Sequence, residues 1–355
     1  MRKLISRSAT LSQLWSLASS SLYTNAFYLM LAQAAIAVLG FLFWVIVARF
    51  YTEAEVGYSS AIISTIGLVS LTGHIGLDSF MVRFLSRARN HVQLLNTCLT
   101  YSGAATLVIS LVCAVGLGVW APRIGFVGSQ PVFLAAFVCF AVATNLSSSV
   151  GAAFVGCRKA KFLLVKDVIF GGVKLFLPLL FLAHFHAFGI VASWGIATMA
   201  ALVISVHVLV PRVLEGYRPR PALTSRLVRR AWGFSGLSYV VSLVGSMPKY
   251  LMPVMVINVL GPEENAYFYV AWAMATVLAF IPGAVAQSLF AEAAYDKRTL
   301  QHNVMRAFQL SFALVLPAAL LMLLLGDKFL LAFGESYSER SVALLQVLVF
   351  AGIPI

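Results

Sequence analysis

The chain has 355 residues, of which 61% are hydrophobic and only 10% are charged, and its mean hydropathy is +0.93. A water-soluble protein of this length needs more polar residues than this to cover its surface. The formal net charge is +13, but Lys and Arg occur in short clusters between apolar segments, which argues against a nucleic acid interface. The composition therefore predicts an integral membrane protein.

Residues 1–22 carry three basic residues, Arg2, Lys3 and Arg7, ahead of a broken apolar stretch. The continuous apolar core and the cleavage site of a signal peptide are both missing from this stretch. We therefore expect 1–22 to form an interfacial segment on the cytoplasmic face of the membrane.

Ten segments are long and apolar enough for membrane-spanning helices, which need about 20 residues each. They cover 25–48, 57–80, 94–120, 131–156, 162–183, 187–210, 233–259, 266–290, 304–325 and 341 onward. The fold class predicted is an all-α polytopic membrane protein. The last segment reaches Ile355 before it has crossed, so we expect the second half of the fold to be incomplete there.

The basic residues are distributed unequally between the connections of these segments. Nineteen of the 25 Lys and Arg residues lie on the side of the N-terminus, a count that places Lys166 in a connection. Four lie on the other side: Arg49, Arg123, Lys328 and Arg340. Because Lys and Arg favour the cytoplasmic side, this distribution predicts a cytoplasmic N-terminus, and we expect a multi-pass protein of the bacterial inner membrane.

A basic connection at 212–232 separates six predicted spans from at least four, and so predicts lobes at 23–211 and 233–355. The two lobes share a weak pattern at an offset of 209 residues, in which Glu55 and Tyr58 correspond to Glu264 and Tyr267. Both lobes begin on the same side. Any repeat is therefore parallel, with its pseudo-symmetry axis along the membrane normal.

Two lysines, Lys174 and Lys249, fall inside predicted spans. Ionisable groups in the bilayer are costly and face a cavity or a partner. Lys249 follows Pro248, so it can contact carbonyls that the proline frees, or it can line a water-filled cavity that binds an anion. For Lys174 the alternatives are the same cavity role and snorkelling from a tilted helix.

His74 and Asp78 are four residues apart near the cytoplasmic end of the second predicted span, with Arg83 just beyond. This spacing places both side chains on one helix face. They are candidates for an inner gate or a coupling site. The alternatives are a proton relay and an Asp78 carboxylate that pairs with a basic group at the inner mouth.

Known catalytic and metal motifs are absent from the sequence. It has no Walker A pattern, no HExxH, no GxSxG and no Cys/His set at zinc spacing. The four cysteines show no CxxC spacing and are interpreted as core residues. We therefore expect no cofactor and no metal. Glu53 and Glu55, in the first outer connection, can imitate the carboxylate pair of a membrane glycosyltransferase, or can belong to a solvated hairpin.

Three motifs occur in order between Asn25 and Leu85: the run Phe43–Arg49, then Glu55-Val56-Gly57, then Gly76-Leu77-Asp78 with Arg83-Phe84-Leu85. Together they resemble the polysaccharide (Wzx-type) flippases of the multidrug/oligosaccharidyl-lipid/polysaccharide exporter superfamily. The resemblance implies two six-helix lobes that use alternating access. The implied substrate is an undecaprenyl-pyrophosphate-linked oligosaccharide, moved to the outer leaflet for cell-surface polysaccharide synthesis.

The resemblance also implies a cationic cavity, for which Lys249, Lys174 and Arg49 are the candidates in this chain. It implies a polysaccharide polymerase and glycosyltransferases as functional partners. A multidrug or small-cation exporter of the same superfamily is the first alternative, and it would require buried carboxylates that the predicted spans almost lack. A glycosyltransferase or polymerase that uses Glu53 and Glu55 is the second.

Overall fold

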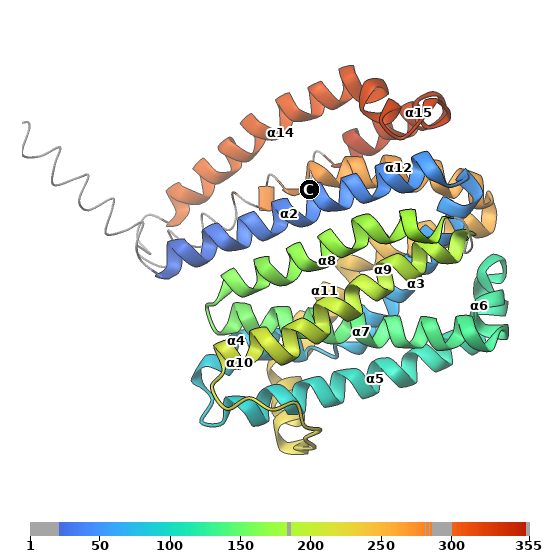
Figure 1. The fold of residues 1–355 in the computed structure, drawn as a ribbon. Helices are drawn as coiled ribbons and strands as arrows, with labels where there is room; N and C mark the ends of the chain where they lie inside the picture. The colour runs from blue at the N-terminus through green and yellow to red at the C-terminus, as the bar shows by residue number, and fades with distance from the viewer. Residues whose placement is uncertain (1–20, 183–185, 281, 284, 286–299, 353–355) are drawn as a thin grey trace, which may run out of the picture.

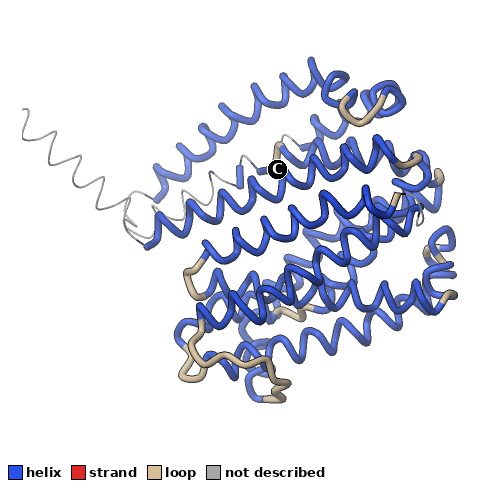
Figure 2. Tube along the Cα trace, viewed as in Figure 1, coloured by secondary structure: helices blue, strands red, loops and turns tan. Residues whose placement is uncertain are grey.

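The computed structural model describes residues 21–182, 186–280, 282–283, 285 and 300–352. All regular secondary structure in this part of the chain is helical (Figure 2). The predicted all-α polytopic class is therefore confirmed. The predicted interfacial segment 1–22 lies outside the described residues, apart from its last two.

Each of the ten predicted segments contains helix. The long helices are α2 (Ser21–Phe50), α3 (Glu53–Gly73), α5 (His91–Trp120), α7 (Pro131–Gly156), α8 (Ala160–Phe181), α9 (His186–Ile204), α11 (Ser225–Val259), α12 (Pro262–Val277), α14 (Leu300–Leu331) and α15 (Glu335–Gly352). The shorter ones are α4 (Leu77–Phe84), η1 (Leu85–Arg87), η2 (Pro122–Ile124), α6 (Phe126–Ser129), the π-helix η3 (Ser205–Leu209) and α10 (Val210–Val213).

Seven helices among the described residues are long and apolar enough to cross a membrane. They are Thr24–Phe50, Glu53–Gly73, His91–Trp120, Pro131–Gly156, His186–Val213, Ser225–Val259 and Ala307–Leu331. Helices α8 and α15 carry four and three charged residues, and α12 is only 16 residues long. These features explain why seven helices meet the criterion while ten segments were predicted.

The long helices run side by side, and their connections gather at two ends of the molecule (Figure 1). We call one end the basic end; it holds the connections at 85–90, 157–159 and 214–224. The opposite end holds those at 51–52, 121–130, 260–261 and 332–334. Helices α14 and α15 form one edge of the molecule, beside α12, and α5 lies toward the other edge.

Two hydrophobic clusters hold the helices together. One joins residues of the N-terminal helices (α2–α10), such as Phe43 and Val56, to residues of the C-terminal helices (α11–α15), such as Tyr267 and Tyr337. The other is centred on α4, α5 and α7, and Ala231 is the buried residue that the C-terminal helices add to it. Apolar packing between the two groups of helices is therefore concentrated in the first cluster.

Two hydrogen bonds at the opposite end are related by the offset of 209 residues seen in the sequence. The Arg49 guanidinium donates to the carbonyl of Ala332, at 2.8 Å. The Arg123 backbone N–H donates to the side chain of Asn258, at 3.3 Å. Adding the offset to positions 49 and 123 gives positions 258 and 332. Equivalent places in the two predicted lobes thus meet in equivalent pairs, as a parallel repeat requires.

The second predicted span is shorter than expected. Helix α3 ends at Gly73, and a turn follows in which Ile75 and Gly76 both have positive φ, 45° and 74°. A β-branched residue rarely adopts this conformation. Asp78 therefore lies in the first turn of α4 rather than on the same helix as His74. The side chains of His74 and Asp78 are nevertheless close together, because the turn keeps α4 near the end of α3.

Two further predictions about connections are wrong. Lys166 lies inside α8 and is buried, not in a connection, since its ammonium pairs with the adjacent Asp167. Helix α11 begins at Ser225, inside the predicted connection 212–232. At 35 residues it is about 52 Å long, which exceeds the roughly 30 Å of bilayer hydrocarbon. Its basic first turns therefore extend beyond the membrane.

Candidate functional site

A polar pocket of about 800 Å³ opens at the basic end of the molecule. Its walls come from α4, η1, the end of α7 and one residue of α11. They consist of Asp78, Ser79, Val82, Arg83, Ser86, Arg87, Val155, Gly156, Cys157, Arg158 and Phe234. We call it the arginine pocket. The predicted residues Asp78 and Arg83 line it, and His74 lies next to it through its contact with Asp78.

Close backbone packing brings the two basic walls of this pocket together. A Cβ on Gly156 would lie 2.7 Å from the carbonyl oxygen of Met81 and 3.0 Å from Cα of Val82. Only glycine allows α7 to approach α4 this closely. The contact brings Arg83 and Arg158 into the lining of one pocket, although they are 75 positions apart in the sequence.

Arg158 has a backbone conformation that an arginine rarely adopts. Its φ is 56°, in the left-handed region, at the C-terminal end of α7. Glycine is the usual residue at this position of a helix cap, and the left-handed conformation costs other residues about 1–2 kcal/mol. This local cost makes Arg158 a candidate for a role of its side chain in the pocket, because glycine would serve the backbone better.

The Asp78 carboxylate is already engaged on both of its oxygens. Oδ1 accepts a hydrogen bond of 2.7 Å from the Ser149 hydroxyl, and Oδ2 lies 3.1 Å from Nε2 of His74. The side chains of His74 and Asp78 therefore pair with each other. A pairing of Asp78 with an arginine at the mouth is not seen among the described residues.

The three arginines of the pocket are all exposed. None of them has an ion pair within the described part of the chain. Clustered guanidinium groups without acidic partners repel one another and favour an anion between them. The ring of Phe234, from α11, adds an apolar wall and packs on Phe84 at 4.9 Å between ring centroids.

Lys174 is buried between α8 and α2. Its ammonium lies over the rings of Phe170 and Phe43, 4.6 and 5.2 Å from their centroids. A cation over aromatic faces is stabilised by the ring quadrupoles. No acidic side chain pairs with it among the described residues. Burial argues against the snorkelling alternative, and Lys174 does not line the arginine pocket.

Lys249 is exposed on α11, which continues through Pro248 and Pro253. Its ammonium lies 5.4 Å from the ring centroid of Tyr250 and makes no hydrogen bond to a carbonyl within the described residues. The structural alternative, in which this lysine contacts carbonyls freed by a kink, is therefore not seen. The exposed position keeps the anion-binding role available.

On the flippase function that the sequence resemblance implies, we predict that Lys249→Ala lowers transport at least tenfold in a complementation assay, at normal protein level in the membrane. The reason is the loss of an exposed cation on α11 that can attract an anion. Lys249→Arg keeps the charge and serves as the control. Full complementation by Lys249→Ala would contradict the predicted role.

Arg49 lies at the opposite end, away from the arginine pocket. Its Nη2 donates to the carbonyl of Leu331 at 2.6 Å, and its Nε to that of Ala332. The Leu331 carbonyl is the last of α14 and Ala332 follows it directly, a position where a cation is favoured by the helix dipole. Arg49 thus joins the N-terminal helices to the C-terminal ones.

Glu53 and Glu55 also form side-chain contacts at this end. Glu55 closes a capping box with Thr52 and contacts Nδ1 of His186 at 2.9 Å. Glu53 accepts a 2.7 Å hydrogen bond from Ser336, which lies in α15. Asn265, at the start of α12, donates to the Gly57 carbonyl at 2.8 Å. The two carboxylates therefore stabilise a helix cap and a contact between helices, which does not resemble a catalytic pair.

Some charged groups of the structure are not predicted from the sequence. Arg87 and Arg158 were counted only as topology signals, yet they line the arginine pocket. The buried Lys166 and Asp167 form an ion pair of 2.9 Å. The adjacency of opposite charges inside an apolar segment was the available signal for this pair. Asp167 also corrects the expectation that the spans almost lack buried acid.

A family model for "polysaccharide biosynthesis protein" matches residues 46–342. No curated protein matches the chain in sequence. An inward-facing multidrug resistance MATE family transporter of the MOP superfamily is similar in structure, with a TM-score of 0.62 and 13% identity over 89% of this chain and 78% of that one.

Two other solved structures are similar to a comparable degree. A MOP superfamily transporter from Pyrococcus furiosus, described as having a binding pocket of reverse polarity, has a TM-score of 0.58 and 13% identity over 94% of this chain and 79% of its own. A MATE in the bent conformation has a TM-score of 0.55 and 12% identity over 94% and 78%. By this family match and this fold, the chain belongs to the polysaccharide biosynthesis protein family and has the architecture of the MOP superfamily transporters.

Proposed function

We propose that the protein is a flippase that moves an anionic lipid-linked oligosaccharide, of the undecaprenyl-pyrophosphate class, to the outer leaflet of a bacterial inner membrane. The observation that carries this proposal is the arginine pocket, with three guanidinium groups that lack acidic partners among the described residues. A pyrophosphate supplies the charge that such a pocket favours. Glycosyltransferases would supply this substrate, and a polymerase would consume the product.

The proposal places the basic end in the cytoplasm. With Lys166 placed inside α8, eighteen Lys and Arg residues support that orientation. At the opposite end, contacts from Arg49, Glu53 and Asn265 hold the N-terminal and C-terminal helices together. We infer an inward-facing state, closed toward the outside and ready to receive substrate from the cytoplasm.

The lipid tail would stay in the bilayer while the headgroup enters. An apolar cleft of about 580 Å³ between α2, α14 and the end of α12 fits this requirement. Its walls include Met30, Gln33, Ala34, Ala37, Val38, Val277, Phe280 and Leu314. Rocking of the two predicted lobes, 23–211 and 233–355, would then turn the headgroup site toward the other leaflet. No covalent step is needed.

The partly buried Asp78 and the buried Asp167 favour the alternative of a small-cation exporter. Each is already paired, Asp78 with His74 and Ser149, and Asp167 with Lys166. Neither is left to bind a cationic drug. We therefore expect cells that express the protein to extrude a cationic dye no faster than control cells, and faster extrusion would favour the exporter.

We predict that Arg83→Gln combined with Arg87→Gln lowers complementation of a flippase-deficient strain by tenfold or more. A charge-assisted hydrogen bond contributes about 1.5–3 kcal/mol, and about 1.4 kcal/mol corresponds to a tenfold change in binding. Arg89→Gln is the matched control, because Arg89 lies on the same connection but does not line the pocket. Equal complementation by the double variant and the control would refute the proposed substrate site.

A further inference from the structure

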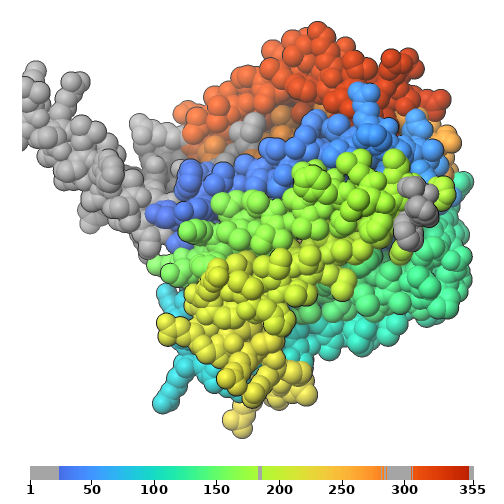
Figure 3. Space-filling model, in the orientation of Figure 1, coloured from blue at the N-terminus to red at the C-terminus, as the bar shows by residue number. Residues whose placement is uncertain are grey.

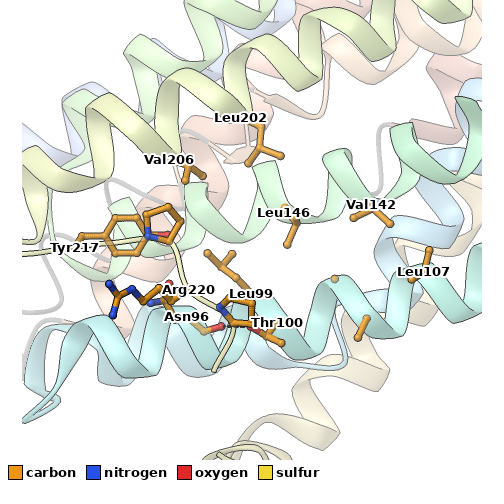
Figure 4. Close-up of a pocket in the computed structure, with 14 residues that line it drawn as sticks. Asn96, Leu99, Thr100, Leu107, Val142, Leu146, Leu202, Val206, Tyr217 and Arg220 are labelled. Carbon is orange, nitrogen blue, oxygen red and sulfur yellow. Dashed lines mark hydrogen bonds between the residues drawn. The ribbon is translucent and has the colours of Figure 1, made fainter. Parts of the chain in front are cut away.

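We propose that a groove on the outer wall of the N-terminal helices binds one membrane lipid with an anionic headgroup. The groove has a volume of about 470 Å³ and shares no residue with the arginine pocket. Its lining comes from α5, α7, α9, η3 and the connection after α10 (Figure 4). The residues are Asn96, Leu99, Thr100, Gly103, Ala104, Leu107, Val142, Leu146, Leu202, Val206, Tyr217, Pro219, Arg220 and Pro221.

The walls of this groove suit a hydrocarbon chain. Its apolar side chains come from three helices that are each long and apolar enough to cross a membrane. On α5 the lining extends from Asn96 to Leu107, which is about 16 Å along a helix. That length is about half of the roughly 30 Å hydrocarbon thickness. The groove therefore matches one acyl chain of a single leaflet, the one at the basic end.

The polar groups lie together at one end of the groove (Figure 4). Asn96 donates to the carbonyl of Arg218 at 2.9 Å, and Thr100 accepts from the Ala222 N–H at 3.2 Å. These bonds fasten the connection to α5. Arg220 has no hydrogen bond or ion pair within the described residues and is exposed. Its guanidinium is thus the group left to bind a ligand.

Charge complementarity identifies the ligand as an anionic lipid. Between Pro211 and Trp232 the chain has six arginines and one acidic residue, Glu215. This segment lies on the surface beside the N-terminal helices (Figure 3). Clusters of Arg at a membrane surface attract the anionic headgroups of the cytoplasmic leaflet. A lipid whose phosphate binds Arg220 and whose acyl chain lies along α5 occupies both the polar and the apolar end of the groove.

The test is native mass spectrometry of the full chain in detergent, with phosphatidylglycerol or phosphatidylcholine of the same acyl chains added. Ala104→Phe fills the groove from its exposed side, and Arg220→Gln removes the cation. Val112→Phe is the matched control, since Val112 is 69% exposed on α5 but lies outside the groove.

We expect the wild type and Val112→Phe to retain one phosphatidylglycerol at least fivefold more tightly than phosphatidylcholine. Ala104→Phe loses both lipids, and Arg220→Gln loses only the preference. Inorganic phosphate does not displace the bound lipid. Equal retention of the two lipids by the wild type, undiminished retention by Ala104→Phe, or displacement by phosphate would each overturn the proposal. A dimer that Ala104→Phe abolishes, with no lipid bound, would assign the groove to a second copy of the chain instead.

Discussion

Replacing Arg158 with glycine is expected to lower transport at least tenfold while leaving the protein at least as stable as the wild type. Arg158 has a φ of 56° at the end of α7. Glycine relieves the cost of this conformation, about 1–2 kcal/mol, so the apparent melting temperature stays level or rises. The same change removes one of three cations from the arginine pocket, and complementation falls at least tenfold.

These opposite effects separate a substrate-binding role from a structural one. A residue that only supports the fold would lower stability and transport together. Lys159→Gln is the matched control, because Lys159 is the exposed neighbour and does not line the pocket. Arg158→Lys keeps the charge but loses bidentate contacts to a phosphate, so we expect an intermediate activity. Normal complementation by Arg158→Gly would show that Arg158 takes no part in binding the substrate.

Local patterns in the sequence predict much of the fold and part of the pocket. Hydropathy locates every long helix among the described residues. A membrane span must form its backbone hydrogen bonds within its own helix and remain apolar over about 20 residues. The grouping of His74, Asp78 and Arg83 also follows from spacing alone. It survives the unexpected turn at Ile75 and Gly76, since a turn of this size leaves neighbouring residues in contact.

The other wall of the pocket depends on a contact that no local pattern contains. Arg158 and Arg83 line one pocket because Gly156 lets α7 touch the backbone of α4. The sequence shows a glycine followed by a basic cluster, and the preference of Lys and Arg for the cytoplasmic side is enough to explain the cluster. Arg49 was likewise predicted as a cavity cation, and its partners, the carbonyls of Leu331 and Ala332, lie more than 280 positions away. Side-chain partners over such separations require the tertiary structure.

The contact between α3 and α12 carries the second large prediction. A Cβ on Gly57 would overlap the carbonyl oxygen of Pro262 and lie 2.5 Å from its carbonyl carbon. These are backbone atoms at the start of α12, so a side-chain rotation cannot relieve the overlap. Gly57→Ala therefore forces apart the first turns of α3 and α12, which lie at the opposite end of the molecule from the arginine pocket. We expect transport to fall at least tenfold, because the protein can no longer close toward the outside.

The readout is the accessibility of position 60 in a cysteine-free background. Ser60 is fully buried and bonded to Asn265 at 3.0 Å, so Ser60→Cys resists a water-soluble maleimide applied from outside. Adding Gly57→Ala exposes it and raises labelling severalfold. Gly172→Ala is the control, since a Cβ there meets no atom within 4 Å. If Gly57→Ala transports normally and position 60 stays protected, closure at this end does not depend on the contact between α3 and α12. If labelling rises while transport is lost and the protein still elutes as one species, the close approach of Gly57 to Pro262 is what holds this end of the molecule closed.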